Sequence, residues 1–134
     1  MSAQIVDKPW GREVILTTSD LPYTAKILEI NAGKRLSLQY HDQKLETLCL
    51  ISGSANIIWG SDKNNLKTEK MLPENGYTIT PNTIHRFEAI TDCQIYEAST
   101  GEIGTTFRLE DDANRPDETE NIRNSKNRGW TKND

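Results

Sequence analysis

Short segments in which apolar and polar residues alternate recur along this chain, separated by glycine, proline or asparagine. Alternation over four to eight residues rich in β-branched side chains predicts β-strands. No ten-residue stretch carries a convincing helical period. Evenly spaced strands of this kind are typical of all-β sandwiches and barrels. The predicted strands cover residues 13–18, 24–30, 34–40, 45–51, 54–60, 66–72, 77–80, 83–90, 93–100 and 107–110.

At 134 residues the chain suits a single domain with a real core. We expect a β-barrel over residues 1–110 and a polar extension over residues 111–134. In that extension only Ile122 and Trp130 interrupt a sequence too polar to form its own core. The extension is either flexible or packed on a partner subunit through Trp130. A mean hydropathy of −0.71 fits such an extension, or a barrel with a polar lumen.

Charge and composition exclude several classes of partner. The net charge of −4 leaves no basic footprint for nucleic acid and disfavours anionic membranes. No window reaches the apolar length of a membrane span, and the first residues lack the apolar core of a signal peptide. Cys49 and Cys93 lack metal-binding spacing, so we expect two buried free thiols. We expect a cytoplasmic protein without nucleic-acid or membrane partners.

A polar stretch between two glycines holds Gln39, His41 and Glu46 within eight residues. On a strand, Gln39 and His41 project from one face because successive side chains alternate. His85, the second of the two histidines, follows in a similar glycine-bounded setting. A lone strand histidine is more often structural, but two matching settings favour a shared site. Two imidazoles, a carboxylate and an amide oxygen suit a divalent transition metal.

The opposite face of the same strand is hydrophobic and carries Leu36, Leu38 and Tyr40. This face packs either against a second sheet or against another subunit. We expect a homodimer.

These residues resemble the two motifs of the cupin superfamily, whose members are small jelly-roll β-barrels. The first motif is matched by Gly33, Gln39-Tyr40-His41, Glu46 and Gly53, with glutamine in place of the first histidine. The second is matched by Gly76, Pro81 and His85. The resemblance implies a metal held by Gln39, His41, Glu46 and His85.

Within the cupins the chain resembles the type II mannose-6-phosphate isomerases, over roughly residues 7–115. That family often forms the C-terminal domain of a fusion with a mannose-1-phosphate guanylyltransferase. The matching positions are Lys8-Pro9-Trp10-Gly11, Lys26, Ser37-Leu38-Gln39, His41, Glu46, Ser52-Gly53, Pro81, His85-Arg86, Arg108, Glu110, Asp111, Asp112 and Arg115. The chain departs from the family pattern at Ala32, Asp42-Gln43-Lys44, Ala113 and Asn114.

The resemblance implies a metal-dependent aldose–ketose isomerase of a sugar phosphate, acting in nucleotide-sugar supply. A metal polarises the carbonyl, a base moves a proton between C1 and C2, and cations hold the phosphate. The base is Arg108 or Lys26, and the sugar-phosphate contacts are Lys44, Arg86 and Arg108. For each cation the alternative is an ion pair with an acidic residue. We expect one divalent metal, with zinc favoured and manganese, iron, cobalt or nickel as alternatives.

A second hypothesis is a non-catalytic cupin that binds a sugar, a sugar nucleotide or a small acid as a sensor or accessory domain. The altered residues 42–44 and the missing guanylyltransferase domain favour this alternative. Another cupin enzyme, such as an oxygenase, also uses histidines and a carboxylate, but the PWG and R-x-E-D-D segments favour the isomerases.

Overall fold

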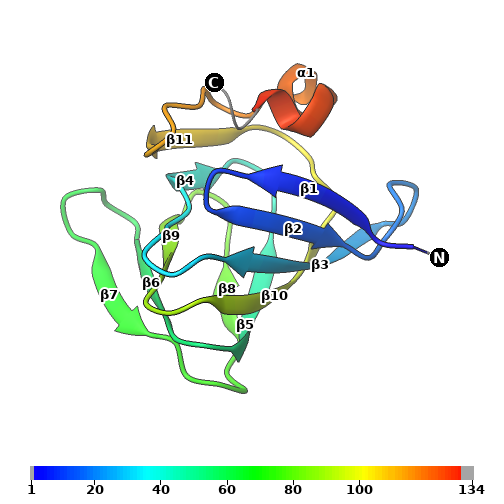
Figure 1. Cartoon of the computed structure of the whole chain (residues 1–134). Helices are drawn as coiled ribbons and strands as arrows, with labels where there is room; N and C mark the ends of the chain where they lie inside the picture. Colours follow the sequence, from blue (N-terminus) through cyan, green and yellow to red (C-terminus); the bar gives the residue numbers. More distant parts are fainter. Residues whose placement is uncertain (1, 131–134) are drawn as a thin grey trace.

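The inner faces of two antiparallel β-sheets enclose the interior of this computed structural model, which describes residues 2–130 (Figure 1). The six-stranded sheet has the order β1-β2-β3-β10-β5-β8, and the five-stranded sheet has the order β11-β4-β9-β6-β7. This arrangement confirms the predicted all-β jelly-roll class, although the two sheets do not share a continuous ladder. The strands are β1 (Gln4–Lys8), β2 (Gly11–Ile15), β3 (Tyr23–Ile30), β4 (Leu38–His41), β5 (Glu46–Ser52), β6 (Ala55–Gly60), β7 (Lys67–Lys70), β8 (Tyr77–Ile79), β9 (Ile84–Ala89), β10 (Cys93–Thr100) and β11 (Thr106–Glu110).

The prediction missed β1, because its five residues sit at the chain end without a preceding turn signal. β1 and β2 form a hairpin across Pro9 and Trp10. Gly11 allows this turn, since a β-carbon there would collide with the backbone carbonyl of Glu29 on β3. The turn thereby buries Trp10 in the hydrophobic core.

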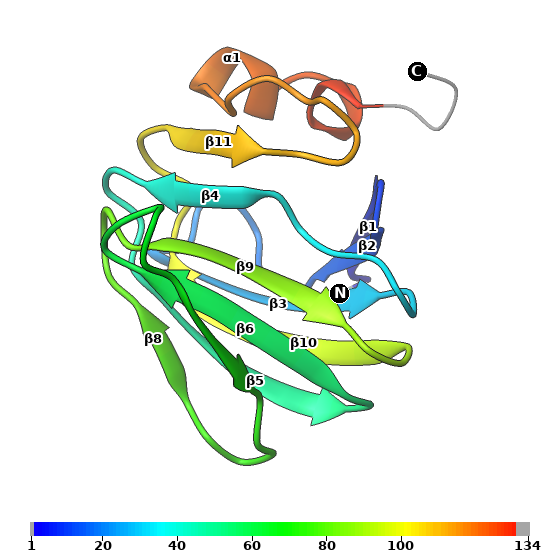
Figure 2. The ribbon, with the colours of Figure 1, turned by 90° about the vertical axis from the view of Figure 1, so that its left-hand side faces the viewer.

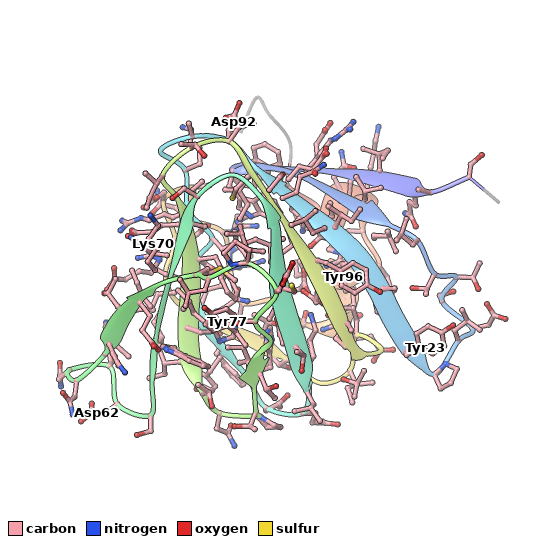
Figure 3. The ribbon with its side chains drawn as sticks, turned by 90° about the horizontal axis from the view of Figure 1, so that it is seen from below. Tyr23, Asp62, Lys70, Tyr77, Asp92 and Tyr96 are labelled. Carbon is pink, nitrogen blue, oxygen red and sulfur yellow. The ribbon has the colours of Figure 1, made fainter. Side chains whose placement is uncertain are left out.

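The interior is apolar at one end and ionisable at the other. Inward positions recur every second residue along a strand. On β10 these positions hold apolar Cys93 and Ile95 at one end and charged Glu97 towards the other. On β3 they change from Leu28 to Lys26. Figure 3 looks into this interior from below, with turn residues such as Asp62 and Asp92 at its periphery. The low mean hydropathy therefore reflects a polar lumen as well as an exposed surface.

The C-terminal segment covers the gap between the two sheets. After β11, the chain turns back and Glu118 pairs with Thr106 through two backbone hydrogen bonds of 2.9 and 3.1 Å. The short helices α1 (Glu120–Arg123) and η1 (Lys126–Gly129) follow, and η1 contacts β1 of the opposite sheet (Figures 1 and 2). Residues 111–130 thus lie against this chain's own sheets, while the domain division at residue 110 stays a prediction.

The hydrophobic stripe of the β4 region is covered within the single chain. Leu38 is buried, Leu36 packs against the core, and Tyr40 stacks on Phe107 with ring centres 4.9 Å apart. The stripe therefore needs no second subunit to cover it. The homodimer stays a prediction. Between residues 2 and 130, no helix has the length and apolar character needed to cross a bilayer.

Candidate functional site

Three strands bring the predicted metal ligands together at the polar end of the interior. His41 ends β4, Glu46 begins β5 and His85 lies in β9. All three residues are buried, and one ligand atom from each lies within 4.8 Å of the other two. Gln39 is directly opposite His85 in the β4–β9 pairing, so it borders the same cluster.

Hydrogen bonds at the outer nitrogens orient both imidazole rings. Nδ1 of His85 lies 2.9 Å from the carbonyl oxygen of Thr83 and donates to it, which leaves Nε2 as the atom with a lone pair. Nδ1 of His41 lies 2.8 Å from Oγ1 of Thr106. Nε2 of His41 lies 2.8 Å from Oε2 of Glu46. Metal-binding histidines are oriented in this way by partners on the ring nitrogen that does not bind the metal.

These residues fit a divalent metal ion. Nε2 of His85 is buried and has no hydrogen-bond partner among the described residues, which is costly for a buried polar atom. A cation placed between His85, His41 and Glu46 would satisfy it. Nε2 of the Gln39 amide lies 3.5 Å from Nε2 of His41, while its oxygen accepts a hydrogen bond from Ser37. Gln39 becomes a fourth ligand if its amide rotates to exchange oxygen and nitrogen.

The protonation states also suit a metal, which binds neutral imidazole and ionised carboxylate. Burial lowers the pKa of His85 to about 4, and nearby His41 adds to this effect while Glu46 opposes it. Burial alone would raise the pKa of Glu46, but Lys44 and His41 lower it to about 2. His85 is therefore neutral and Glu46 ionised at pH 7.

Next to the metal ligands, buried lysines and glutamates form a network of ion pairs. Nζ of Lys44 lies 3.0 Å from Glu97 and 3.1 Å from Glu102. Nζ of Lys26 lies 3.1 Å from Glu102 and 3.2 Å from Glu13. Burial would lower the pKa of each lysine, but these carboxylates raise it above its ordinary value. Both ammonium groups therefore stay charged, which disfavours the predicted role of Lys26 as a proton acceptor.

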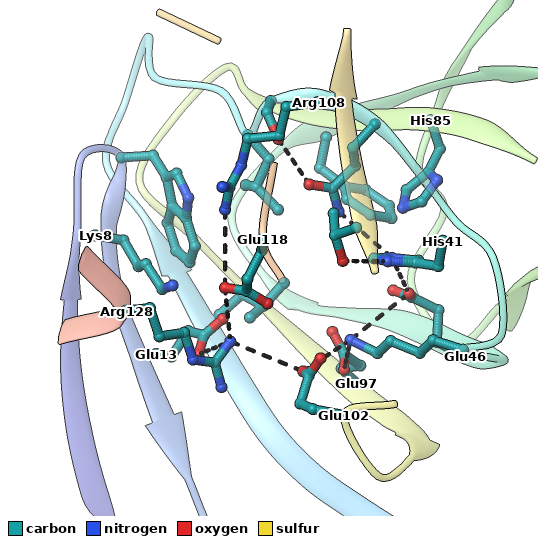
Figure 4. Close-up of a pocket in the computed structure, with 18 of the residues that line it drawn as sticks. Lys8, Glu13, His41, Glu46, His85, Glu97, Glu102, Arg108, Glu118 and Arg128 are labelled. Carbon is teal, nitrogen blue, oxygen red and sulfur yellow. Dashed lines mark hydrogen bonds and ion pairs between the residues drawn. The ribbon is translucent and has the colours of Figure 1, made fainter. Parts of the chain in front are cut away.

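The metal cluster and this network line one cavity of about 50 Å³. Figure 4 shows His41, Glu46 and His85 on the right and Lys8 and Arg128 on the left, with Glu118 between the two groups. Small-molecule sites usually enclose roughly 300–1,000 Å³, so the ion pairs fill most of the space that a sugar phosphate would need. The lining residues are Lys8, Trp10, Glu13, Lys26, Leu28, Leu36, Ser37, Gln39, His41, Lys44, Glu46, His85, Phe87, Glu97, Glu102, Thr106, Arg108, Arg115, Glu118 and Arg128.

One predicted substrate contact lies outside the cavity. Arg86 follows His85 on β9, and consecutive strand residues face opposite sides. Its Nε donates to the carbonyl oxygen of Leu36 at 3.0 Å, and its Nη1 lies 3.5 Å from exposed Glu110. Arg86 therefore does not line the cavity. The other predicted catalytic or substrate-binding cations, Lys26, Lys44 and Arg108, do line it.

The end of the cavity away from the histidines is strongly charged. Arg108 and Arg128 line it, and both lie near Glu118. Burial lowers the pKa of Lys8 to about 8, although Glu13 opposes the shift. Burial, with Arg115 nearby, also lowers the pKa of Arg108.

Sequence reasoning gave no site role to seven acidic or basic residues of this cavity. Two of them, Lys8 and Arg115, were noted only as matches to the family pattern. Glu13 and Glu97 occupy inward positions of predicted strands, so charges at buried strand positions were a signal for them. Glu102, Glu118 and Arg128 lie in loops or short helices, where no periodicity marks an inward position.

A family model described as "Mannose-6-phosphate isomerase C-terminal" matches residues 2–118. The chain belongs to this family. The family resemblance predicted from the sequence is thus confirmed. In this mannose-6-phosphate isomerase C-terminal domain the match ends at Glu118, so α1 and η1 lie beyond it.

The chain is similar to mannose-1-phosphate guanylyltransferase RfbM from Salmonella typhimurium, with 30% identity over 112 residues. The alignment covers 81% of this chain but only 21% of RfbM, so the chain spans about a fifth of the length of that relative.

Two solved structures show the same cupin fold. The capsular polysaccharide assembling protein CapF from Staphylococcus aureus superposes with a TM-score of 0.71 at 14% identity, over 82% of this chain and 32% of CapF. Oxalate decarboxylase from Bacillus subtilis, in a structure described by its Mn(II) centres, gives a TM-score of 0.66 at 15% identity, over 80% of this chain and 30% of that one. At these identities the likeness concerns the fold alone.

Proposed function

We propose that the chain is a metal-dependent aldose–ketose isomerase of a sugar phosphate, of the mannose-6-phosphate isomerase type. The observation that carries the proposal is the convergence of His41, Glu46 and His85 beside a cavity lined by both basic and acidic side chains. Membership of the mannose-6-phosphate isomerase C-terminal family supports the substrate class.

In this proposal Gln39, His41, Glu46 and His85 hold one divalent metal ion. When bound, the metal polarises the sugar carbonyl and offsets the negative charge that develops as a proton leaves the neighbouring carbon. We propose zinc, since two imidazoles and a carboxylate are common zinc ligands. Manganese is the alternative, because the structurally similar oxalate decarboxylase has Mn(II) centres.

The residue that carries the proton between C1 and C2 is, in this proposal, Glu97. An arginine loses its proton too reluctantly to serve, and Lys26 is held charged by carboxylates. The pKa of Glu102 is held well below its ordinary range by Lys44 and Lys26, despite burial, which makes it a weak base. Despite burial, Lys26 and Lys8 hold the pKa of Glu13 below its ordinary range as well. Glu97 is the remaining carboxylate of this network, and Lys44 and the Ser99 hydroxyl, 3.0 and 2.9 Å away, fix its position.

The charged end of the cavity suits the phosphate group. Arg108 offers a planar guanidinium that can bind two phosphate oxygens at once, and Lys8 adds a buried ammonium. Lys44 is placed nearer the histidines, where it contacts Glu46 at 3.8 Å. We therefore assign Lys44 to the sugar and Arg108 and Lys8 to the phosphate.

A second function is a cupin that binds a sugar phosphate or related acid without turnover. The small cavity filled by ion pairs favours this reading, because a substrate must displace charged side chains before it can enter. The chain's limited span of RfbM also fits an accessory domain.

A coupled assay of mannose 6-phosphate conversion to fructose 6-phosphate separates the two functions. The protein is assayed with one equivalent of zinc or manganese, and again after chelation. The isomerase proposal predicts turnover that chelation abolishes and metal restores. Binding of the sugar phosphate by the metal-loaded protein, without turnover, would establish the second function instead.

A further inference from the structure

The carboxylate of Glu118 lies among arginine side chains at the charged end of the cavity. Its Oε1 atom lies 3.9 Å from Nη2 of Arg108 and 3.8 Å from Nη1 of Arg128. Its Oε2 atom lies 3.5 Å from Nε of Arg123. The Glu118 side chain is only 5% exposed, so this carboxylate is a buried anion held by three cations.

These contacts are too long to satisfy the arginines. Charge-assisted hydrogen bonds between nitrogen and oxygen are about 2.7–2.9 Å long, and none joins Glu118 to an arginine here. Nε of Arg108 is buried and has no hydrogen-bond partner between residues 2 and 130, and the same holds for Nε of Arg123. The cluster therefore presents more donors than the two oxygens of Glu118 can take up.

We propose that Glu118 is a resident anion in a phosphate-binding site formed by Arg108 and Arg128, and that an incoming phosphate group displaces it. A phosphate group carries three free oxygens and up to two negative charges, so it can accept from the unpartnered Nε of Arg108 and still contact Arg128. Nη1 of Arg128 also lies 3.6 Å from Glu13 and 3.8 Å from Glu102, and Lys8, assigned above to the phosphate, lines the same cavity. The displaced Glu118 keeps a partner, because Arg123 contacts its other oxygen and does not line the cavity.

The surrounding segment is built so that Glu118 can move at low cost. Glu118 is held to β11 by its two backbone bonds with Thr106, whereas its side chain is held only by arginine contacts of 3.5–3.9 Å. The following helices α1 and η1 are each four residues long and bury no residue. Arg128 comes from η1, beyond the part of the chain that matches the family. The site is thus completed by a segment that lies beyond the family match.

The inference depends on the proposed function only for the identity of the natural ligand, a sugar phosphate. Its test needs neither a metal nor turnover. Binding of inorganic phosphate to the full chain is measured by isothermal titration calorimetry, with chloride at matched ionic strength as the competing anion. The variants are Glu118→Gln, which removes the resident charge, and Asp112→Asn, which removes the same charge from an exposed pair with Arg35 outside the cavity.

We expect Glu118→Gln to bind phosphate at least about tenfold more tightly than the wild type, because no carboxylate competes for the arginines. Asp112→Asn should bind like the wild type. Phosphate should also raise the melting temperature of Glu118→Gln more than that of the wild type, since it restores the missing anion. Equal phosphate affinity in Glu118→Gln and the wild type would overturn the inference and leave Glu118 a structural ion pair.

A second variant covers the case in which Glu118→Gln does not fold. Arg128→Met removes a donor and leaves Glu118 in place, so phosphate affinity should fall at least about fivefold below that of Asp112→Asn. Unchanged affinity would contradict the inference. If the protein converts mannose 6-phosphate but fails this phosphate-binding test, the proposed isomerase function stands and the inference about Glu118 is wrong. If it passes this test but shows no turnover, the phosphate site stands and the isomerase function is wrong.

Discussion

Nδ1 of His85 donates to the backbone carbonyl of Thr83 at 2.9 Å, and this bond turns Nε2 of the ring toward His41 and Glu46. Because the acceptor is a main-chain atom, the ring is oriented by the path of the strand itself. The candidate metal site is thus preformed in the fold, and five predictions follow from its geometry and its surroundings.

Replacing either histidine by alanine should empty the metal site. His41→Ala and His85→Ala each remove one of three converging ligands, and two remaining ligands hold a transition metal weakly. We expect less than about a tenth of an equivalent of metal after dialysis, measured by elemental analysis. The Gln39→Ala variant should keep metal with reduced affinity. Full stoichiometric metal in either histidine variant would refute the ligand assignment.

The Thr106 hydroxyl should support metal binding through His41. Thr106→Val removes the partner of Nδ1 and preserves the shape of the side chain, so the ring loses its orientation. We expect metal affinity to fall roughly 10–100-fold, as measured by competition with a chromophoric chelator. Thr78→Val, at an exposed threonine paired with Thr47, is the matched control and should leave affinity unchanged.

Acid should destabilise the metal-free protein from about pH 6.5 downwards. The folded pKa of His85 is about 4 against an ordinary 6.5, so between these values the unfolded chain binds a proton that the folded chain refuses. The folded pKa of Glu46 is about 2 against 4.5, which continues the loss of stability at lower pH. The free energy of unfolding, measured with urea, should fall as the pH is lowered from about 6.5 to about 2. A curve independent of pH would contradict these assignments.

Lys44→Met should cost much more stability than a matched surface change. Lys44 is buried and compensates Glu97 and Glu102, so its removal leaves both carboxylates to share Lys26, which lies 3.8 Å from Glu97 and 3.1 Å from Glu102. Breaking such a buried pair costs roughly 3–5 kcal/mol. Lys67→Met breaks an exposed pair with Glu69 and should change the free energy of unfolding by about 0.5 kcal/mol or less. Similar losses in both variants would show that the buried network contributes little.

The proposed base can be tested separately from the metal. Glu97→Gln keeps the size of the side chain but removes the proton acceptor, so turnover should fall at least about 100-fold. Metal stoichiometry should stay unchanged, because Glu97 is not among the ligands. A variant that keeps turnover would shift the role to another residue of the network.

The sequence was sufficient to predict that the candidate ligands His41, Glu46 and His85 converge, largely because strand geometry places them. Gln39 and His41 share a face by the alternation of β4, and the turn that follows brings Glu46 beside them. The distant His85 joins them through the pairing of β9 with β4. The sequence indicated His85 by its glycine-bounded setting and by the family resemblance, not by strand pairing. Local periodicity and turn chemistry therefore carry this part of the site.

The charged end of the cavity could not be predicted in the same way. Glu118 and Arg128 lie in a polar segment with no apolar period, and such a composition usually indicates exposure to solvent. Glu118 is buried and Arg128 is partly buried because the two sheets leave a gap between β11 and β1, and the segment fills it. Nothing local in the sequence encodes that gap. Arg86, predicted as a substrate contact, does not line the cavity because its neighbour His85 takes the inward position.

The proposed function requires that a metal ion held by His41, Glu46 and His85 supports isomerisation. The most direct measurement titrates the metal-free protein with zinc or manganese and follows mannose 6-phosphate conversion at each step, with His85→Ala in parallel. We predict that the rate rises with bound metal and levels off at one equivalent, whereas His85→Ala stays inactive. Wild-type protein that binds one equivalent of metal and shows no turnover would contradict the proposed isomerase function.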